Sequence, residues 1–271
     1  MRRKPDGSMN HQRSVAARFS AAAATYDSHA AVQKEAAERV VGLTAGLTPN
    51  RRILEIGCGS GLLTEKLAVL LPEATICAVD ISAAMIQMAQ ARLAGKGGIL
   101  WIVGDVDSVR NGALFDLVVS SSALHWITPL EPAFKGLAGG LVTGGHLVFS
   151  IMIEGTLAEL HAARREVAPG KEAQSKLPSE NEVVRSLKGA DFEIASQERT
   201  SSRIQFPSAA AFLKCLHEQG LTGGRFSRAG AQLTRADLRK LVSSYDSNYK
   251  DGIGGVYATY EILYVVAKKR V

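Results

Sequence analysis

The fold of this chain is decided by one stretch of sequence, Ile53-Leu54-Glu55-Ile56-Gly57-Cys58-Gly59-Ser60-Gly61. Its first half is typical of a short, mainly apolar strand, and the pattern that follows over 62–70 is typical of a helix. Glycines between a strand and a helix let the backbone turn tightly and approach a ligand, toward which the helix N–H groups point. The spacing is G-x-G-x-G, whereas a dinucleotide-binding fingerprint needs its third glycine one residue later. We therefore predict a strand–turn–helix unit for a nucleotide-like ligand, and the spacing disfavours NAD.

Short apolar runs alternate with helical patterns around this turn. The sequence predicts strands over 52–56, 75–80, 99–103, 115–120 and 146–151, with helices over 32–47, 62–70, 82–93 and 130–141. Such alternation builds right-handed βαβ units around a parallel sheet. Beyond residue 153 we expect helices over 156–166, 179–187, 208–218 and 235–245, an extended segment over 192–206 and a final strand over 256–267. The polar residues 1–12 predict no element.

Composition sets the broad class of protein. The 271 residues are 46% hydrophobic and 21% charged, which excludes disordered and fibrous classes. There is no apolar run long enough for a membrane-spanning helix, and the short alanine stretch over 21–24 is a poor secretory signal. The three cysteines form no CxxC pair, so we expect a reduced, cytoplasmic protein without disulfides or a metal site. The net charge of +6 suits an acidic partner or an anionic small molecule, but without a dense Lys/Arg run we expect no nucleic acid.

Acidic residues close the next two predicted strands. Asp80 ends the strand over 75–80, where a carboxylate can bind both hydroxyls of a ribose. Asp105 follows the strand over 99–103, where its carboxylate and the N–H of Val106 can bind the edge of an adenine. Carboxyl ends of parallel strands share one edge of a sheet, and that edge binds ligands. The alternative is a plain tight turn with exposed acidic residues.

The patterns at 55–61, 79–82, 104–106 and 115–120 together resemble the class I S-adenosylmethionine (SAM) methyltransferases over about residues 50–150. The resemblance implies an α/β fold with a Rossmann-like sheet that is mostly parallel, with an antiparallel C-terminal strand. It also implies helices on both faces and a helical cap over the substrate site. The implied cofactor is SAM, which leaves as S-adenosylhomocysteine, and no metal is expected.

The same resemblance implies a set of cofactor-binding residues. Ile81 and Met85 would pack on the adenine ring, although ordinary core packing of a helix face is an equal alternative. The implied set within the core is Gly57, Cys58, Gly59, Gly61, Asp80, Ile81, Met85, Asp105, Val106 and Ser121.

A narrower resemblance extends over nearly the whole chain. Patches at 19–27, 32–33, 123–126, 155–160 and 259–261 look like the malonyl-acyl-carrier-protein O-methyltransferases of biotin synthesis. This implies methylation of the free carboxylate of a malonyl thioester on acyl carrier protein, which gives the methyl ester that starts the pimeloyl chain. It also implies a monomer with an N-terminal helical lid over 1–48 and a SAM-binding core over 49–152. An elaboration over 153–255 would cover the acceptor, and 256–271 would be the last strand of a single compact domain.

The resemblance suggests roles for residues outside the core. Tyr26 and Gln33 would belong to the lid and contact the cofactor. Tyr26, His125 and Trp126 are candidates for positioning the acceptor, and packing is the alternative for each. A carboxyl group is already ionised at neutral pH, so no general base is needed. One cation should bind the acceptor carboxylate, and the candidates are Arg164, Arg165, Lys171 and Lys176, with a solvated basic face as the alternative.

Two alternatives to this function stay open from the sequence. The acceptor could be another small carboxylic acid or a modified nucleotide, with the same cofactor. The chain could also bind SAM without catalysing a transfer, although the three glycines of the turn and Asp80 argue against that.

Overall fold

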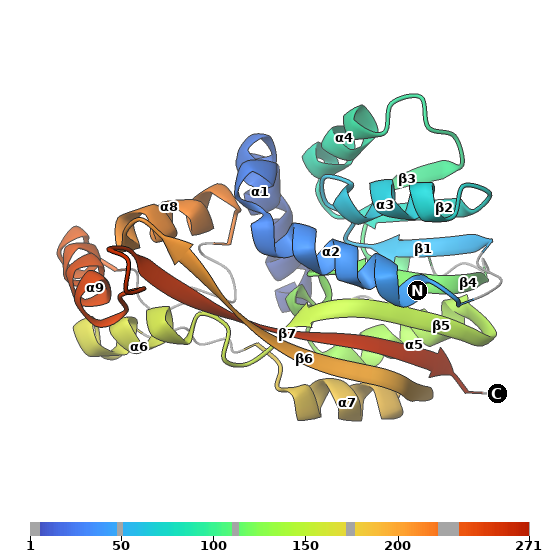
Figure 1. The fold of residues 1–271 in the computed structure, drawn as a ribbon. Coiled ribbons are helices and arrows are strands. Elements are labelled where there is room, and N and C mark those ends of the chain that lie inside the picture. The colour runs from blue at the N-terminus through green and yellow to red at the C-terminus, as the bar shows by residue number, and fades with distance from the viewer. Residues whose placement is uncertain (1–5, 48–50, 110–113, 172–176, 222–232, 271) are drawn as a thin grey trace.

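The computed structural model describes residues 6–47, 51–109, 114–171, 177–221 and 233–270, and shows one seven-stranded sheet with helices around it (Figure 1). The strands are β1 (Arg52–Ile56), β2 (Thr75–Asp80), β3 (Ile99–Val103), β4 (Phe115–Ser121), β5 (Leu141–Met152), β6 (Phe192–Phe206) and β7 (Val256–Lys269). The helices are α1 (Asp6–His29), α2 (Ala31–Thr44), α3 (Leu62–Leu70), α4 (Ala83–Arg92), α5 (Leu130–Gly140), α6 (Ala158–Val167), α7 (Glu180–Lys188), α8 (Ala209–Glu218) and α9 (Arg235–Asn248), with short 3-10 turns η1 (Val106–Val109) and η2 (Leu124–Trp126).

The strand order is β3-β2-β1-β4-β5-β7-β6. Strands β1 to β5 pair in parallel, and β7 runs antiparallel between β5 and β6. The predicted Rossmann-like sheet with an antiparallel C-terminal strand is therefore confirmed. The parallel order places the carboxyl ends of β1, β2, β3 and β4 at one edge, where the crossover connections leave room for a ligand.

Helices cover both faces of the sheet, as predicted. Alternate residues of a strand point to opposite faces, so Ile53 joins one buried cluster and Leu54 the other. The first cluster contains residues of α2, α3 and α4, and the second contains residues of α5 and α7. Because both faces are covered, the central strands are almost continuously apolar.

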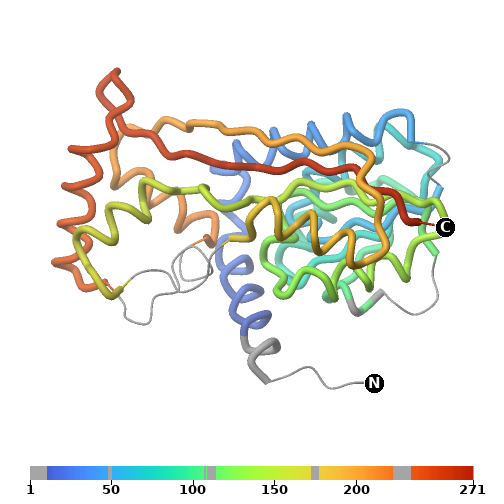
Figure 2. The backbone as a smooth tube through the Cα atoms, turned by 90° about the horizontal axis from the view of Figure 1, so that it is seen from below, coloured from blue at the N-terminus to red at the C-terminus, as the bar shows by residue number. Residues whose placement is uncertain are grey.

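The last two strands continue beyond the rest of the sheet. β5 ends its pairing with β7 at Met152, opposite Ile262, whereas β6 and β7 stay paired as far as Phe206 and Val256. The helices α6, α8 and α9 lie around this two-stranded ribbon, residues 201–206 and 256–261 (Figures 1 and 2). We call these three helices the cap. The rings of Phe212 and Tyr245, 5.3 Å apart, pack inside the cap.

The N-terminal helix differs from the prediction. α1 begins at Asp6, although the polar sequence over 1–12 suggested no element. Its first turns are tied to distant parts of the chain, since the Gln12 amide donates to the Asp105 carboxylate at 3.2 Å. Figure 2 shows α1 crossing the molecule between the core and the cap. Within the described parts of the chain, none of the helices combines the length and hydropathy needed to cross a membrane.

Candidate active site

The glycine turn, residues 57–61, joins β1 to α3 at the ligand-binding edge of the sheet. The φ angles of Gly57, Gly59 and Gly61 are +71°, +55° and +86°, a region that favours glycine. A Cβ on Gly57 would lie 2.3 Å from the Ala123 Cβ, so the fold itself requires glycine there. A Cβ on Gly59 would meet no atom within 4 Å, so Gly59 leaves open space above the turn. The two positions therefore differ. Gly57 is packed against Ala123, whereas a side chain at position 59 would extend into open space above the turn.

The carboxylate of Asp80 is fixed beside this turn. One oxygen accepts a hydrogen bond from the Gly59 N–H at 2.9 Å, and the other accepts one from the Ser82 N–H at 2.8 Å. Burial raises the pKa of Asp80 above its ordinary value, and these N–H donors act in the opposite direction. Each carboxylate oxygen keeps a further lone pair, so the group can still accept hydrogen bonds from two vicinal hydroxyls.

The next strand end presents Asp105 and Val106. Val106 opens η1, and the first N–H of such a turn has no partner within it. The Asp105 carboxylate accepts hydrogen bonds from Ser108 at 3.2 Å and from Gln12 of α1 at 3.2 Å. Sequence reasoning missed Gln12, because no local pattern links it to a residue 93 positions away.

Of the two candidates outside the core, Tyr26 lies on α1 and Gln33 on α2. Burial and the charges of Asp80 and Asp27 raise the pKa of the Tyr26 phenol. Gln33 is 6% exposed, and its side-chain N–H donates to the Gln219 amide oxygen at 3.1 Å. Its own amide oxygen is buried without a hydrogen-bond partner among the described residues. A buried acceptor in this state favours a ligand with an N–H donor.

Beneath the turn lies a buried carboxyl that sequence reasoning did not assign to the site. Glu55 is 1% exposed and accepts a hydrogen bond from the Thr64 hydroxyl at 2.7 Å. Burial raises its pKa to about 8, and the nearby charge of Asp80 adds to the shift. Glu55 belongs to the quoted motif, and an acidic residue in an otherwise apolar strand is the signal that singles it out.

The remaining cofactor candidates of the core surround the same edge. Met85 is buried in α4, and its N–H donates to the Ser82 hydroxyl at 3.2 Å, while Ile81 is half-buried. Cys58 is buried within the turn, and burial raises the pKa of its thiol. The Ser121 hydroxyl, at the end of β4, lies 3.3 Å from the Ser150 hydroxyl. All four predicted residues lie at or beside the carboxyl ends of β1, β2 and β4.

His125 and Trp126 lie in η2, directly after β4. Both are buried, and their rings are 5.3 Å apart. The Trp126 ring packs edge-on against Phe19 of α1 at 5.5 Å, and the Arg18 guanidinium lies 5.9 Å from its centre. Trp126 therefore lies where α1 meets the core. Its predicted role in positioning the acceptor stays a prediction.

Three of the four candidate cations lie in the cap or the loop that follows α6. Arg164 is buried, and its Nε donates to the backbone oxygen of Lys171 at 2.7 Å. The Lys171 ammonium binds the Asp237 carboxylate at 2.7 Å, which lowers the pKa of Asp237 to about 2. Arg165 is exposed on α6, and Lys176 lies outside the described residues. The structure thus brings Arg164 and Lys171 together and gives each a partner inside the cap.

Taken together, this edge fits a ligand that carries a ribose. The space over Gly59 admits a ligand against the backbone, and the Asp80 carboxylate suits the ribose hydroxyls.

Comparison with known proteins agrees with this geometry. A family model described as a methyltransferase domain matches residues 53–145. Among solved structures, the YcgJ protein from Bacillus subtilis has a TM-score of 0.61 at 14% identity, covering 86% of this chain and 99% of that one. A geranyl diphosphate methyltransferase solved in complex with SAM has a TM-score of 0.52 at 12% identity, covering 87% and 85%. These structural likenesses show the fold.

Sequence relatives extend the likeness over the whole chain. The malonyl-[acyl-carrier protein] O-methyltransferase of Geobacter sulfurreducens is 32% identical, covering 96% of this chain and 100% of that protein. Its namesake from Hahella chejuensis is 33% identical, covering 92% and 87%. The matches include the lid helices and the cap as well as the glycine turn. This chain belongs to the malonyl-acyl-carrier-protein O-methyltransferase family.

Proposed function

We propose that this chain transfers a methyl group from SAM to the free carboxylate of a malonyl thioester held by acyl carrier protein. The products are S-adenosylhomocysteine and the malonyl methyl ester, the starting unit of pimeloyl-chain synthesis for biotin. One observation carries the proposal: a full-length match to relatives of that name accompanies a glycine turn that is open at Gly59 and bonded to Asp80. In this proposal no metal takes part.

The chain's own residues bind and orient the cofactor. SAM supplies an electrophilic methyl group on a positively charged sulfur. The open face of Gly59 receives its methionine part, and the Asp80 carboxylate accepts hydrogen bonds from the ribose. Asp105 and the Val106 N–H hold the adenine edge. The helix α1 closes over these groups and excludes water, so that the methyl group meets only the intended acceptor.

The acceptor side needs positioning rather than proton transfer. A malonyl carboxyl has a pKa near 4, so at neutral pH it already carries the negative charge with which it attacks the methyl carbon. The new C–O bond forms as the C–S bond breaks, and the bonding electrons stay on sulfur. Holding the methyl group and the carboxylate oxygen in line can lower the activation free energy by roughly several kcal/mol. A cation held to one side of the carboxylate, with Arg164, Arg165, Lys171 and Lys176 as candidates, leaves one oxygen free to react.

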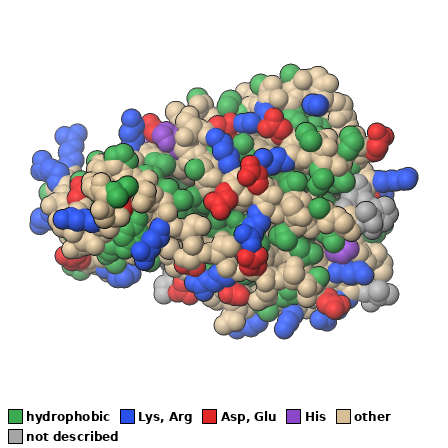
Figure 3. Space-filling model, in the orientation of Figure 1, with side chains coloured by type: hydrophobic (Ala, Val, Ile, Leu, Met, Phe, Trp, Pro, Cys, Tyr) green, Lys and Arg blue, Asp and Glu red, His purple; other side chains and the backbone are tan. Residues whose placement is uncertain are grey.

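The cap and the charge of the chain support a carrier-protein substrate. Carrier proteins are acidic, and this chain has a net charge of +6. Figure 3 shows Lys and Arg side chains gathered at the end formed by the cap, and exposed cations of α9 include Arg235, Arg239 and Lys240. We propose that residues 153–255 cover the acceptor, that 1–48 form the lid and 49–152 the SAM-binding core, and that the enzyme acts as a cytoplasmic monomer.

Mass spectrometry of the carrier protein tests the proposal directly. Malonyl-carrier protein incubated with SAM and the enzyme should gain the mass of one methylene unit on the malonyl group, and alkaline hydrolysis, which also cleaves the thioester, should release the methyl group as methanol. Acetyl-carrier protein, which lacks the free carboxylate, should gain nothing. A methyl group that resists saponification would place the new bond on nitrogen or carbon and contradict the proposal.

The same assay separates the competing acceptors. Malonyl-CoA and free dicarboxylates, supplied at equal concentration, should react more slowly than malonyl-carrier protein. Equal rates on all of them would remove carrier-protein recognition from the proposal. Binding of SAM without transfer to any acceptor would instead support a non-catalytic role.

A further inference from the structure

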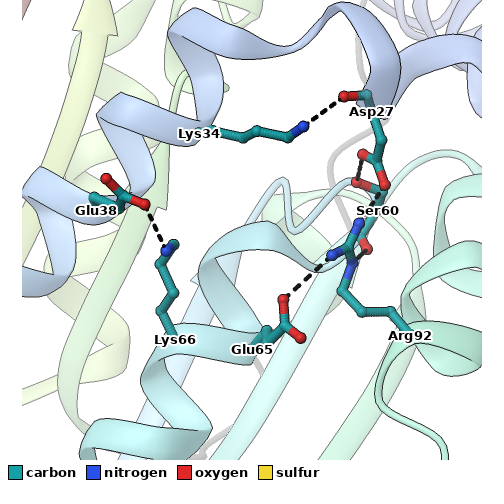
Figure 4. Close-up of polar contacts among 7 residues, drawn as sticks. All are labelled: Asp27, Lys34, Glu38, Ser60, Glu65, Lys66 and Arg92. Atoms are coloured by element: carbon teal, nitrogen blue, oxygen red, sulfur yellow. Dashed lines mark hydrogen bonds and ion pairs between the residues drawn. The ribbon is translucent and has the colours of Figure 1, made fainter.

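Asp27, near the end of α1, binds the glycine turn and α4 at the same time (Figure 4). Its Oδ1 accepts a hydrogen bond from the Ser60 hydroxyl at 2.5 Å, and its Oδ2 forms an ion pair with Arg92. Ser60 lies between Gly59 and Gly61, so this contact reaches the centre of the turn. The lid helix is thus bonded to the loop that we propose binds the cofactor.

Arg92, the last residue of α4, completes the arrangement. Its Nε donates to the backbone oxygen of Ser60 at 2.8 Å, and its Nη1 lies 3.2 Å from the Glu65 carboxylate. A planar guanidinium can hold several such acceptors in fixed directions at once. The side chains of Arg92 and Asp27 are only 25% and 28% exposed, so solvent screens the pair incompletely. We call the Asp27–Arg92 pair with its Ser60 contacts the lid clasp.

The clasp fixes the part of α1 that lies over the site. Tyr26 directly precedes Asp27, and its ring packs on that of Phe19 at 6.2 Å. Two more contacts run from α1 to the same edge: the Ser20 hydroxyl lies 2.9 Å from the Ser82 hydroxyl, and Gln12 binds Asp105. α1 therefore touches the ends of three successive strands. These contacts lie along the edge that we propose binds the cofactor.

We propose that Asp27 and Arg92 are positioning residues whose ion pair holds the lid on the glycine turn and retains the bound cofactor. They touch neither the cofactor nor the acceptor in this proposal and act through Ser60 and Tyr26. The proposal rests on the proposed function only in taking SAM as the ligand.

A second ion pair provides a matched control. Lys66 of α3 binds Glu38 of α2 at 2.9 Å, so it also joins a lid helix to the core, but it makes no contact with the glycine turn (Figure 4). Replacing Arg92 with Met removes its ion pairs with Asp27 and Glu65, and replacing Lys66 with Met removes its ion pair with Glu38. Only the Arg92 variant should affect the cofactor.

Calorimetric titration with S-adenosylhomocysteine measures the effect without any acceptor. Arg92→Met should raise the Kd about tenfold or more, since hydrogen bonds to charged groups are lost. Arg92→Lys should recover part of the affinity, and Lys66→Met should leave the Kd within about twofold of wild type. In steady state, Arg92→Met should raise KM for SAM with kcat unchanged or higher. Equal Kd values for Arg92→Met and Lys66→Met would overturn the proposal.

A double-mutant cycle separates the clasp from general loosening of the turn. Asp27→Asn keeps an acceptor for Ser60 but removes the charge that binds Arg92. If the pair acts as one unit, Asp27→Asn combined with Arg92→Met should raise the Kd no further than Arg92→Met alone. Fully additive effects would show that each residue acts separately and would contradict the clasp.

Fluorescence of Trp126 reports the position of α1 in the cofactor-free protein. Phe19 of α1 packs on Trp126 at 5.5 Å, and Trp101→Phe makes Trp126 the only tryptophan. In that background, Arg92→Met should increase acrylamide quenching, and Lys66→Met should not. Unchanged quenching in Arg92→Met would overturn the proposal. Failure of the wild-type chain to bind S-adenosylhomocysteine would instead contradict the proposed function itself.

Discussion

The carboxylate of Asp80 accepts a hydrogen bond from the N–H of Gly59 at 2.9 Å. Two parts of the proposed cofactor site, the end of β2 and the centre of the glycine turn, are therefore held together by the protein alone. The carboxylate that would bind the ribose also fixes the backbone that would contact the methionine part.

Replacing Asp80 should therefore weaken SAM binding in two ways. Asp80→Asn keeps an oxygen acceptor and should raise the Kd about tenfold, whereas Asp80→Ala loses both the ribose contact and the Gly59 anchor and should raise it about a hundredfold. Titration calorimetry with SAM measures both. Asp116→Asn is the control, because Asp116 binds the N–H groups of Arg51 and Arg52 at the opposite edge of the sheet. An unchanged Kd for Asp80→Ala would show that the cofactor lies elsewhere.

Alanine at two glycines of the same turn should have different consequences. At Gly59 the new Cβ meets no protein atom, so Gly59→Ala should lower the free energy of unfolding by about 1–2 kcal/mol, through the positive φ, yet greatly weaken SAM binding. At Gly57 the new Cβ overlaps Ala123, so Gly57→Ala should lower the free energy of unfolding by about 1–3 kcal/mol in addition to that strain.

Urea unfolding and SAM titration of both glycine variants check this contrast. Adding Ala123→Gly to Gly57→Ala should recover part of the lost stability by removing the overlap. If Gly59→Ala binds SAM as wild type does, the space above the turn does not receive the ligand.

Glu55 should make the stability of the cofactor-free protein depend on pH. Burial raises its pKa in the folded state to about 8, against an ordinary value of 4.5. Between these two pH values the unfolded state releases a proton that the folded state keeps, so stability falls as pH rises through the window. The loss is at most about 1.4 kcal/mol per pH unit.

Glu55→Gln tests this by removing the ionisable group while keeping an acceptor for Thr64. The melting temperature of the variant, relative to wild type, should rise steadily from pH 5 to about pH 8. Differential scanning calorimetry across this range measures it. A difference that does not change with pH would mean that Glu55 titrates at its ordinary value.

The candidate cations can be separated by kinetics. Arg164→Met should raise KM for malonyl-carrier protein about tenfold while the Kd for SAM stays within about twofold, because the acceptor carboxylate loses a partner and the proposed cofactor contacts are all kept. Arg185→Met, which removes an exposed cation from α7, should change neither value. If the KM of Arg164→Met equals that of wild type, Arg164 does not bind the acceptor, and its hydrogen bond to Lys171 serves the structure of the cap alone. The same measurement then decides among Arg165, Lys171 and Lys176.

Much of the core could be predicted from sequence because its signals are local. The apolar run and glycines at 53–61 set β1 and the turn, and the bounds of α3, β2 and β3 agree with the prediction residue for residue. Sheet strands covered on both faces are apolar throughout, which makes them easy to recognise. β5 was predicted to begin at residue 146 but begins at Leu141, since Gly144 and Gly145 interrupt its apolar pattern.

The lid could not be predicted in the same way because long-range contacts determine it. The start of α1 has no regular apolar face. Its contact with the core includes the hydrogen bond from the Gln12 amide to the Asp105 carboxylate. Asp27 belongs to the patch at 19–27, but Arg92 belongs to none of the patches singled out in the sequence, and 65 positions separate the two residues. Only the folded chain reveals that they meet at Ser60.

The ribbon formed by the ends of β6 and β7 has a consequence for how such enzymes diversify. In the cap, α6 follows β5, α8 follows β6 and α9 precedes β7, so none of the three helices is connected to β1, β2, β3 or β4. Insertions, deletions or replacements in the cap therefore leave the pairing of β1 to β4 intact. Such enzymes can therefore change the cap to accept a new substrate. The part of the chain that we propose binds the methyl donor stays the same.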